Sequence, residues 1–188
     1  MRIITGKAKG TKLDTLDGSD TRPTAERTKE AVFSMLQFDI EGRVVLDLFA
    51  GSGQMGLEAV SRGAECAFLV DRSKSAVEII KKNAQKTKLA DMCRIACDDS
   101  IAFLKKQNGE ARFDIIFLDP PYASDLINQS LEILACKKLV KNTSYIVCES
   151  ASFDFLSENN AKKYEIVKKV KHGIAHVMIL KCREDVEL

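Results

Sequence analysis

The chain has 188 residues, 45% of them hydrophobic and 30% charged, which suits one domain with a small appendage and excludes two full enzymatic domains. It contains only 3 prolines and 10 glycines, so a disordered chain and a fibrous repeat are also excluded. No run approaches the roughly 18 apolar residues that cross a bilayer, and the first residues do not form a signal peptide, so we expect a soluble cytoplasmic protein without a membrane partner.

The basic residues are distributed unevenly, although the net charge of +2 indicates no partner by itself. Residues 1–13 contain four of them and no acid, and residues 162–183 contain seven against the single acid Glu165. Such segments suit a polyanion, but a solvated surface explains the charge pattern about equally well. The four near the N-terminus are Arg2, Lys7, Lys9 and Lys12.

The first 43 residues differ in pattern from the rest of the chain. We expect a short β-ribbon between residues 2–5 and 11–13, turning at Gly6 and Gly10, followed by an amphipathic helix over 24–36. The residues of this helix that should face inward are Ala25, Val32, Phe33 and Leu36. Since 43 residues are too few for a core of their own, they should pack as an extension on a domain formed by residues 44–188.

From residue 44 onward, short apolar runs alternate with amphipathic helical patterns. The predicted strands are residues 44–48, 66–70, 93–97, 113–118 and 144–148, and the predicted helices are 54–62, 73–87, 99–107 and 124–136. This βαβ spacing predicts an α/β fold with an open parallel sheet and helices on both faces. Two further runs, 164–170 and 175–181, join through His172-Gly173 and should add an antiparallel hairpin, which gives a seven-stranded sheet.

The six cysteines contain no Cys-x-x-Cys pair, and most of them lie in apolar runs. We interpret them as buried, reduced thiols and expect no metal site, because only His172 and His176 could supply further ligands. The cysteines are Cys66, Cys93, Cys97, Cys136, Cys148 and Cys182.

A glycine loop follows the first predicted strand and opens a helix. Its spacing, Gly51-x-Gly53-x-x-Gly56, also fits a dinucleotide-binding fingerprint. However, Asp47 precedes the loop, where a carboxylate would repel a pyrophosphate but would suit the ammonium group of a ligand. Asp71 ends the second strand and is placed to accept hydrogen bonds from ribose hydroxyls of either cofactor class. The loop therefore predicts a site for a nucleoside.

The third and fourth strands also end in acidic residues. Of Asp98 and Asp99, one could bind an adenine amino group while the other caps the next helix; we prefer Asp99 as the ligand, and the spacing leaves Asp98 possible. The fourth strand runs into Asp119-Pro120-Pro121-Tyr122. Two prolines in succession form a rigid loop at the carboxyl edge of the sheet, where open α/β sheets bind ligands. The Asp119 carboxylate and Pro120 carbonyl could hold both hydrogens of a planar amino group, and the Tyr122 ring could stack on a base.

Together these motifs resemble the class I S-adenosylmethionine-dependent methyltransferases that act on exocyclic amino groups. Further segments narrow the resemblance to the RsmD family, which methylates N2 of one guanine in bacterial small-subunit (16S) ribosomal RNA. These segments are Arg2 to Leu13, Arg22 to Thr24, Glu30 to Leu36, Asp47 to Gly53, Gly56 to Ala59 and Ser61 to Ala64. The resemblance covers essentially the whole chain and departs from the family at Gln54-Met55, where small or aliphatic residues are more usual.

The resemblance implies a Rossmann-like methyltransferase domain over 44–188, an RNA-binding extension over 1–43, and S-adenosylmethionine as cofactor without a metal. The implied substrate is ribosomal RNA in the 30S subunit or its assembly intermediate; we expect a monomer, since no apolar stripe indicates a dimer. The implied cofactor-binding residues are Asp47, Phe49, Gly51, Gly53, Asp71, Arg72, Asp98 and Asp99. Asp119 and Pro120 would position the guanine amino group and Tyr122 would stack on the base. The implied RNA-binding residues are Arg2, Lys7, Lys9, Lys12 and Arg22.

Three alternatives stay open from the sequence. The Asp119-Pro120-Pro121-Tyr122 loop also fits methylation of adenine N6 in DNA or of a glutamine amide in a protein. The glycine loop fits an NAD-linked oxidoreductase, which would leave this proline loop unexplained. A ribosome-assembly factor could also use such a fold only to bind RNA.

Overall fold

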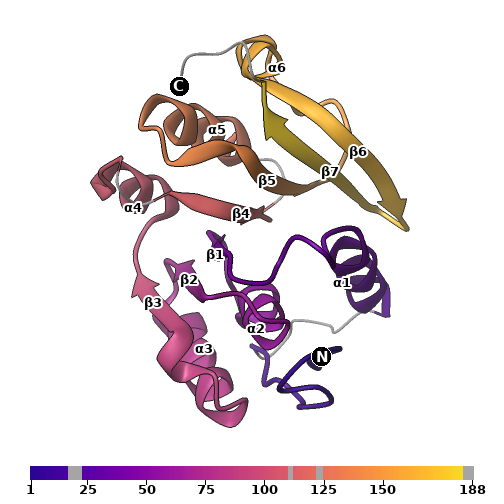
Figure 1. The fold of residues 1–188 in the computed structure, drawn as a ribbon, viewed down its shortest axis with the longest axis vertical. Helices are drawn as coiled ribbons and strands as arrows, with labels where there is room; N and C mark the ends of the chain where they lie inside the picture. The colour runs from indigo at the N-terminus through magenta and orange to yellow at the C-terminus, as the bar shows by residue number, and fades with distance from the viewer. Residues whose placement is uncertain (17–22, 110–111, 122–124, 184–188) are drawn as a thin grey trace.

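The computed structural model describes residues 1–16, 23–109, 112–121 and 125–183. Seven strands form one sheet in the order β3-β2-β1-β4-β5-β7-β6 (Figure 1). Neighbouring strands from β3 to β5 pair in parallel, and β7 pairs antiparallel with both β5 and β6. The strands are β1 (Val44–Asp47), β2 (Cys66–Asp71), β3 (Cys93–Cys97), β4 (Phe113–Leu118), β5 (Val140–Ser150), β6 (Tyr164–His172) and β7 (Ala175–Cys182). The predicted α/β sheet with its antiparallel hairpin is confirmed.

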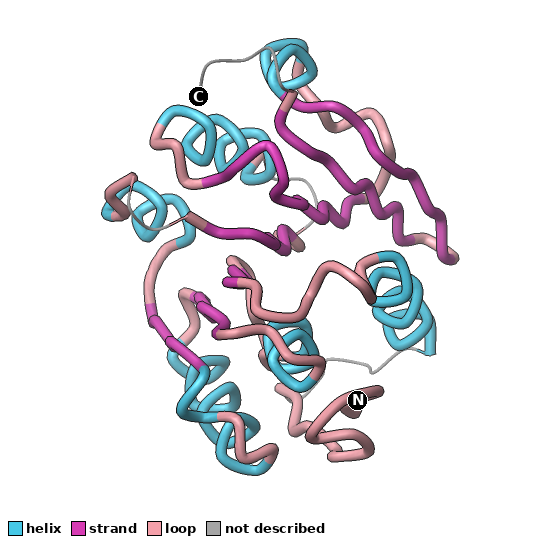
Figure 2. Tube along the Cα trace, viewed as in Figure 1, coloured by secondary structure: helices cyan, strands magenta, loops and turns pink. Residues whose placement is uncertain are grey.

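Helices cover both faces of this sheet (Figures 1 and 2). One face packs against α1, α2 and α3, and the other packs against α4 and α5, with α6 beside α5. The helices are α1 (Pro23–Met35), α2 (Gln54–Ser61), α3 (Lys74–Lys86), α4 (Ser100–Lys106), α5 (Leu126–Cys136) and α6 (Glu158–Lys163), with a 3₁₀ turn, η1 (Ala90–Met92). Because both faces are covered, β4 is buried along its whole length, as its continuous apolar run predicts.

The structure differs from the sequence-based predictions in several elements. β5 extends from Val140 to Ser150, well beyond the predicted 144–148, and the short elements η1 and α6 were not predicted. The N-terminal ribbon reduces to one isolated bridge between Arg2 and Lys12. Gly6 and Gly10 do adopt left-handed φ angles, 85° and 84°, so the segment turns at the expected glycines without forming strands.

The prediction of buried cysteines is wrong for three of the six. Cys93, Cys148 and Cys182 are buried, whereas Cys66 is half-buried and Cys97 and Cys136 are exposed. Cys97 ends an edge strand and Cys136 lies in the last turn of α5, where one side has no covering layer. All six are free thiols.

The N-terminal segment, residues 1–16, is anchored to α1 and α2. The buried carboxylate of Glu58 accepts hydrogen bonds from the backbone N–H groups of Ile4 at 2.7 Å and Thr5 at 3.0 Å. The ammonium of Lys29 lies 3.5 Å from Glu58 and donates to the Arg2 carbonyl at 2.6 Å. Both side chains are almost fully buried, so separating Lys29 from Glu58 would leave a buried charge without its partner. Because both side chains also bind the backbone of the N-terminal segment, they hold this segment on the sheet domain.

No helix within the described ranges is long and apolar enough to span a membrane. The same ranges contain no cluster of His, Cys, Asp and Glu that could hold a metal ion.

Candidate active site

A cavity of about 440 Å³ lies at the carboxyl ends of the parallel strands. This volume is within the usual range for small-molecule sites, and the position is where open α/β sheets bind ligands. The residues that line it are Leu48, Phe49, Asp71, Arg72, Asp99, Ser100, Asp119, Pro120, Pro121, Leu126 and Glu149. The topology thus brings together sequence-predicted site residues from four strand ends with one further acid, Glu149, and other groups that were not predicted.

The glycine loop after β1 is held in place by hydrogen bonds from both sides. Gly51 and Gly53 have φ angles of 54° and 79°, which only glycine adopts without strain. The N–H of Gly51 donates to the Asp71 carboxylate at 2.9 Å, and the fully buried Asn83 amide donates to the Ser52 carbonyl at 2.9 Å. The loop is therefore preorganised and aligned with the end of β2.

Asp47 lies at the base of this loop and is only 4% exposed. Its carboxylate accepts a hydrogen bond from the Gly56 N–H at 3.1 Å. Burial raises the pKa of Asp47 to about 7, and the nearby charge of Asp71 acts in the same direction. A ligand ammonium placed beside Asp47 would compensate the buried charge, which is the role that the resemblance implies for this residue.

This raised pKa predicts a pH-dependent contribution to stability. Since the folded-state pKa of about 7 exceeds the ordinary 3.8, the contribution is fully present below about pH 4 and is lost as the pH rises to about 7. We expect the free energy of unfolding of the wild type to fall, relative to that of Asp47→Asn, across this interval in denaturant titrations. The asparagine keeps an acceptor for Gly56, so a difference independent of pH would contradict the raised pKa.

The acids after β2 and β3 differ in their availability to a ligand. Asp71 accepts hydrogen bonds from Gly51 and from the Ser73 N–H at 2.8 Å, yet it still lines the cavity. Asp99 caps α4 by accepting from two backbone N–H groups, and it also lines the cavity. Asp98 is absent from the lining and pairs with Lys106 at 2.6 Å, which lowers its pKa. The geometry favours Asp99 over Asp98 as the residue that faces a ligand.

Asp119 follows β4 directly and opens into the cavity, whereas Pro120 is buried. The surrounding protein atoms partly desolvate the Asp119 carboxylate and so raise its pKa, and the nearby charges of Glu149 and Asp47 raise it further, although the residue is exposed at the cavity. The pKa of Glu149 is raised by burial as well. Tyr122, the predicted stacking residue, lies outside the described residues.

Glu149 was not predicted as a site residue. It follows the apolar run of β5 in the same way that Asp47 and Asp119 follow the apolar runs of β1 and β4, and this repeated signal could have identified it. Ser100 and Leu126, at the starts of α4 and α5, line the cavity without any distinctive motif.

A smaller cavity of about 100 Å³ adjoins the first on the α1 side of the sheet. It is lined by Asp47, Phe49, Asp119, Glu149 and ten other residues, among them Gln54. The buried Oε1 atom of Gln54 has no hydrogen-bond partner within the described residues. An unpaired buried acceptor beside the buried Asp47 carboxylate fits the ammonium end of an amino-acid ligand, while Asp71 and Asp99 fit a nucleoside in the larger cavity.

Comparison with known proteins decides the family. Residues 1–181 match the family model described as Conserved hypothetical protein 95. A curated relative from Haemophilus influenzae, named Ribosomal RNA small subunit methyltransferase D, is 35% identical over 151 residues, covering 80% of this chain and 78% of its own. The chain belongs to the RsmD family. The protein YlbH of Bacillus subtilis is 34% identical across 97% of this chain and 100% of its own length.

Solved structures agree with this family membership. The protein yhhF of Escherichia coli superposes with a TM-score of 0.84 at 27% identity, covering 97% of this chain and 98% of its own. An RNA methyltransferase from Salinibacter ruber, solved with S-adenosyl-L-homocysteine, has a TM-score of 0.66 at 17% identity over 88% of this chain and 96% of its own, a likeness of fold alone. The fold of this RsmD-family chain is that of class I S-adenosylmethionine-dependent methyltransferases.

Proposed function

We propose that this RsmD-family chain transfers a methyl group from S-adenosylmethionine to N2 of one guanine in small-subunit ribosomal RNA. The observation that carries the proposal is that the Asp119 residue lines the same nucleoside-sized cavity as Asp71 and Asp99. An acceptor for an amino group thereby faces the site of a nucleoside cofactor. Family membership and the name of the Haemophilus influenzae relative support ribosomal RNA as substrate.

The described residues fit S-adenosylmethionine along its length. Asp47 and the Gln54 Oε1 atom would accept hydrogen bonds from the ammonium, Asp71 would bind the ribose, and Asp99 the adenine, with Phe49 and Arg72 lining the same cavity. Gly51 and Gly53 would let the backbone approach the methionine end closely. When bound, the cofactor supplies an electrophilic methyl group on a positively charged sulfur.

The chain's own contribution to the transfer is positioning. Asp119 and the Pro120 carbonyl accept both N2 hydrogens and orient the nitrogen lone pair, which forms the new N–C bond as the C–S bond breaks and its electron pair remains on sulfur. In its ionised form, Asp119 also stabilises the positive charge that develops on N2. The surplus N2 proton then leaves to Asp119 or to water. A paired base cannot present its amino group in this way, so the guanine must be unstacked.

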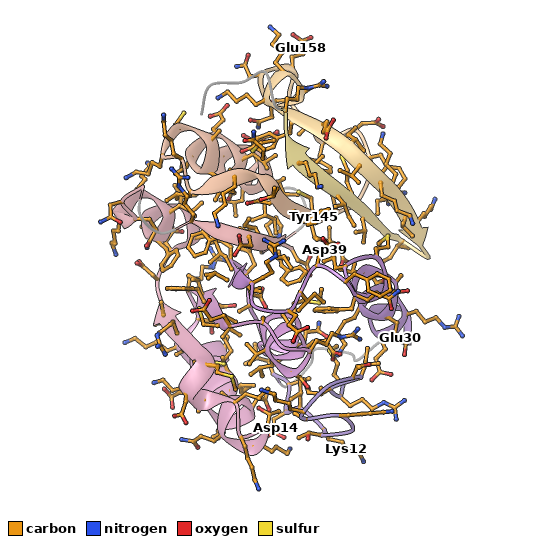
Figure 3. The ribbon with its side chains drawn as sticks, in the orientation of Figure 1. Lys12, Asp14, Glu30, Asp39, Tyr145 and Glu158 are labelled. Atoms are coloured by element: carbon orange, nitrogen blue, oxygen red, sulfur yellow. The ribbon has the colours of Figure 1, made fainter. Side chains whose placement is uncertain are left out.

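The N-terminal extension, residues 1–43, would bind the RNA phosphates. Arg2, Lys7, Lys9 and Lys12 are all exposed on the anchored N-terminal segment, and Lys12 lies at its periphery (Figure 3). Arg22, also predicted to bind RNA, lies outside the described residues. The proposed setting is the cytoplasm, with the 30S subunit or its assembly intermediate as partner and the enzyme as a monomer.

Replacing Lys7, Lys9 and Lys12 together by alanine should weaken RNA binding. Each lost phosphate contact reduces the slope of log K against log salt by about 0.7 to 0.9, so we expect the slope to fall by about 2. A matched triple variant of the exposed residues Lys81, Lys82 and Lys105 tests for a general effect of charge. The slopes are measured by filter binding across a salt series. Equal slopes for both triple variants would mean that the N-terminal segment does not bind RNA.

The proposal is tested by offering methyl-labelled S-adenosylmethionine with three acceptors: unmodified small ribosomal subunits, DNA and bulk protein. We expect label in the RNA of the subunits alone. Label in DNA or protein would favour the alternatives of adenine N6 or a glutamine amide. Cofactor binding with no transfer to any acceptor would favour an assembly factor, and NAD binding in place of S-adenosylmethionine would favour an oxidoreductase.

A further inference from the structure

Glu149 lies beside Asp119 at the centre of the site. β4 and β5 pair in parallel with Leu118 opposite Cys148, so Asp119 and Glu149, the next residues, are neighbours across the two strands. Along each strand, side chains alternate between faces: Phe117 and Val147 belong to the core on the α1 side, and Leu118 and Cys148 to the other. Asp119 and Glu149 therefore point to the same side of the sheet.

Neither of these two carboxylates has a donor partner among the described residues. No group in those ranges forms a hydrogen bond or an ion pair with either carboxylate. The surrounding protein atoms raise the pKa of both groups, and the charge of Glu149 raises the pKa of Asp119 further. Both line the larger and the smaller cavity, and Glu149 also lines a third cavity of about 330 Å³ beyond the Pro120-Pro121 loop. Two adjacent acceptors that line the cavities and have no donor among the described residues indicate a ligand that brings donors to both.

The chemistry of amino-bearing substrates narrows that ligand. In adenine and cytosine, the ring nitrogen next to the amino-bearing carbon is an acceptor, and in a glutamine amide the neighbouring group is a carbonyl oxygen. Each would direct a lone pair at the second carboxylate. In guanine, the amino-bearing carbon lies between N3, an acceptor, and N1, which carries a hydrogen, so N1–H and N2–H form adjacent donors on one edge. When Asp119 and the Pro120 carbonyl take both amino hydrogens, guanine alone among these groups has a further donor for Glu149.

We propose that Glu149 selects guanine, by accepting a hydrogen bond from N1–H while Asp119 and Pro120 hold the N2 amino group. The proposal rests on the proposed guanine N2 transfer and adds the residue that discriminates between bases. Glu149 is thus a specificity-determining residue that touches the substrate. In the wild type, a base without N1–H leaves the Glu149 carboxylate unpaired, so the site rejects that base. A variant without the Glu149 charge should therefore prefer guanine less strongly.

The test combines a variant with a base analogue. 2-Aminopurine keeps the 2-amino group but has an unprotonated N1, so it removes the donor that Glu149 is proposed to recognise. Small subunits assembled on ligated RNA with either guanine or 2-aminopurine at the target position are methylated by wild type, by Glu149→Gln and by the exposed control Glu132→Gln. Glutamine keeps the shape of Glu149 and can donate to the N1 acceptor of 2-aminopurine.

We expect wild type and Glu132→Gln to favour guanine over 2-aminopurine by about 100-fold in kcat/KM, as the loss of a hydrogen bond to a charged group implies. Glu149→Gln should lose about 10- to 100-fold on guanine and bring the ratio of the two bases close to one. Its affinity for S-adenosylmethionine and its Tm should match those of wild type.

An unchanged ratio in Glu149→Gln would overturn the proposal. So would a parallel loss on both bases together with weaker S-adenosylmethionine binding, because that pattern places Glu149 on the cofactor. The wild type alone also tests the proposal, because equal rates on guanine and 2-aminopurine would exclude recognition of N1–H. Failure of wild type to methylate guanine N2 at all would instead refute the proposed function, so the two failures are distinguishable.

Discussion

Asp119→Ala should lose at least about 100-fold in turnover of ribosomal RNA while binding S-adenosylmethionine with unchanged affinity. The expected loss is similar to that caused by removing a single preorganised polar group that stabilises a transition state. Cofactor affinity should survive because Asp47, Asp71 and Asp99 remain in place. Isothermal titration gives the affinity, and single-turnover transfer of labelled methyl groups gives the rate.

Two controls make the Asp119 result specific. Asp119→Asn keeps one acceptor oxygen and should retain intermediate activity. Neither variant should destabilise the fold, because removing Asp119 relieves the repulsion from Glu149 and Asp47 that raises its pKa. Near-normal turnover of Asp119→Ala would mean that the loop after β4 does not hold the amino group.

Gly6→Ala should lower the free energy of unfolding by about 3 kcal/mol, the largest stability effect that we expect from a single methyl group. A Cβ atom on Gly6 would lie 1.8 Å from the backbone oxygen of Ser61, and the residue has a φ of 85°. Relief of that overlap moves the turn away from α2 and breaks the hydrogen bonds that Ser61 accepts from Lys7 at 2.8 Å and Ala8 at 3.0 Å. For a chain of this length the Tm should fall by about 6 to 12 °C.

Gly10→Ala is the matched control for Gly6→Ala. Gly10 has nearly the same φ, 84°, but a Cβ there meets nothing within 4 Å. Gly10→Ala should lower the free energy of unfolding only by the strain of the left-handed backbone, about 1 kcal/mol.

Gly6→Ala should also methylate RNA poorly at temperatures where it remains folded and binds S-adenosylmethionine. Equal Tm values for the two variants would contradict the close packing of the N-terminal segment on α2.

The sequence predicts the sheet well because its central strands are buried. The first four strands are short apolar runs separated by segments long enough for helices. Because burial requires apolar residues, such runs can be recognised in the sequence. Polar residues that follow these runs then lie at the carboxyl edge by topology. For this reason the sequence alone is enough to assign Asp71, Asp99 and Asp119 to one site, and the cavity brings them together.

Features that depend on tertiary contacts could not be predicted from the sequence pattern. The end of β5 pairs with β7 through Ser150 and His176, so the strand continues past its apolar run and carries Glu149 into the site. Helix α6 has no apolar periodicity; it is held by its Ser157 cap and by the buried Asn160, which donates to the Asn128 carbonyl at 3.1 Å. The first residues form a looped segment because Glu58, from a distant helix, takes their N–H groups.

The most direct test of the central claim is the identity of the methylated nucleoside. Unmodified small ribosomal subunits are incubated with the protein and methyl-labelled S-adenosylmethionine, and the digested RNA is analysed by mass spectrometry. We expect N2-methylguanosine at a single site. Label in any other nucleoside, or its absence from RNA while the protein binds S-adenosylmethionine, would contradict it.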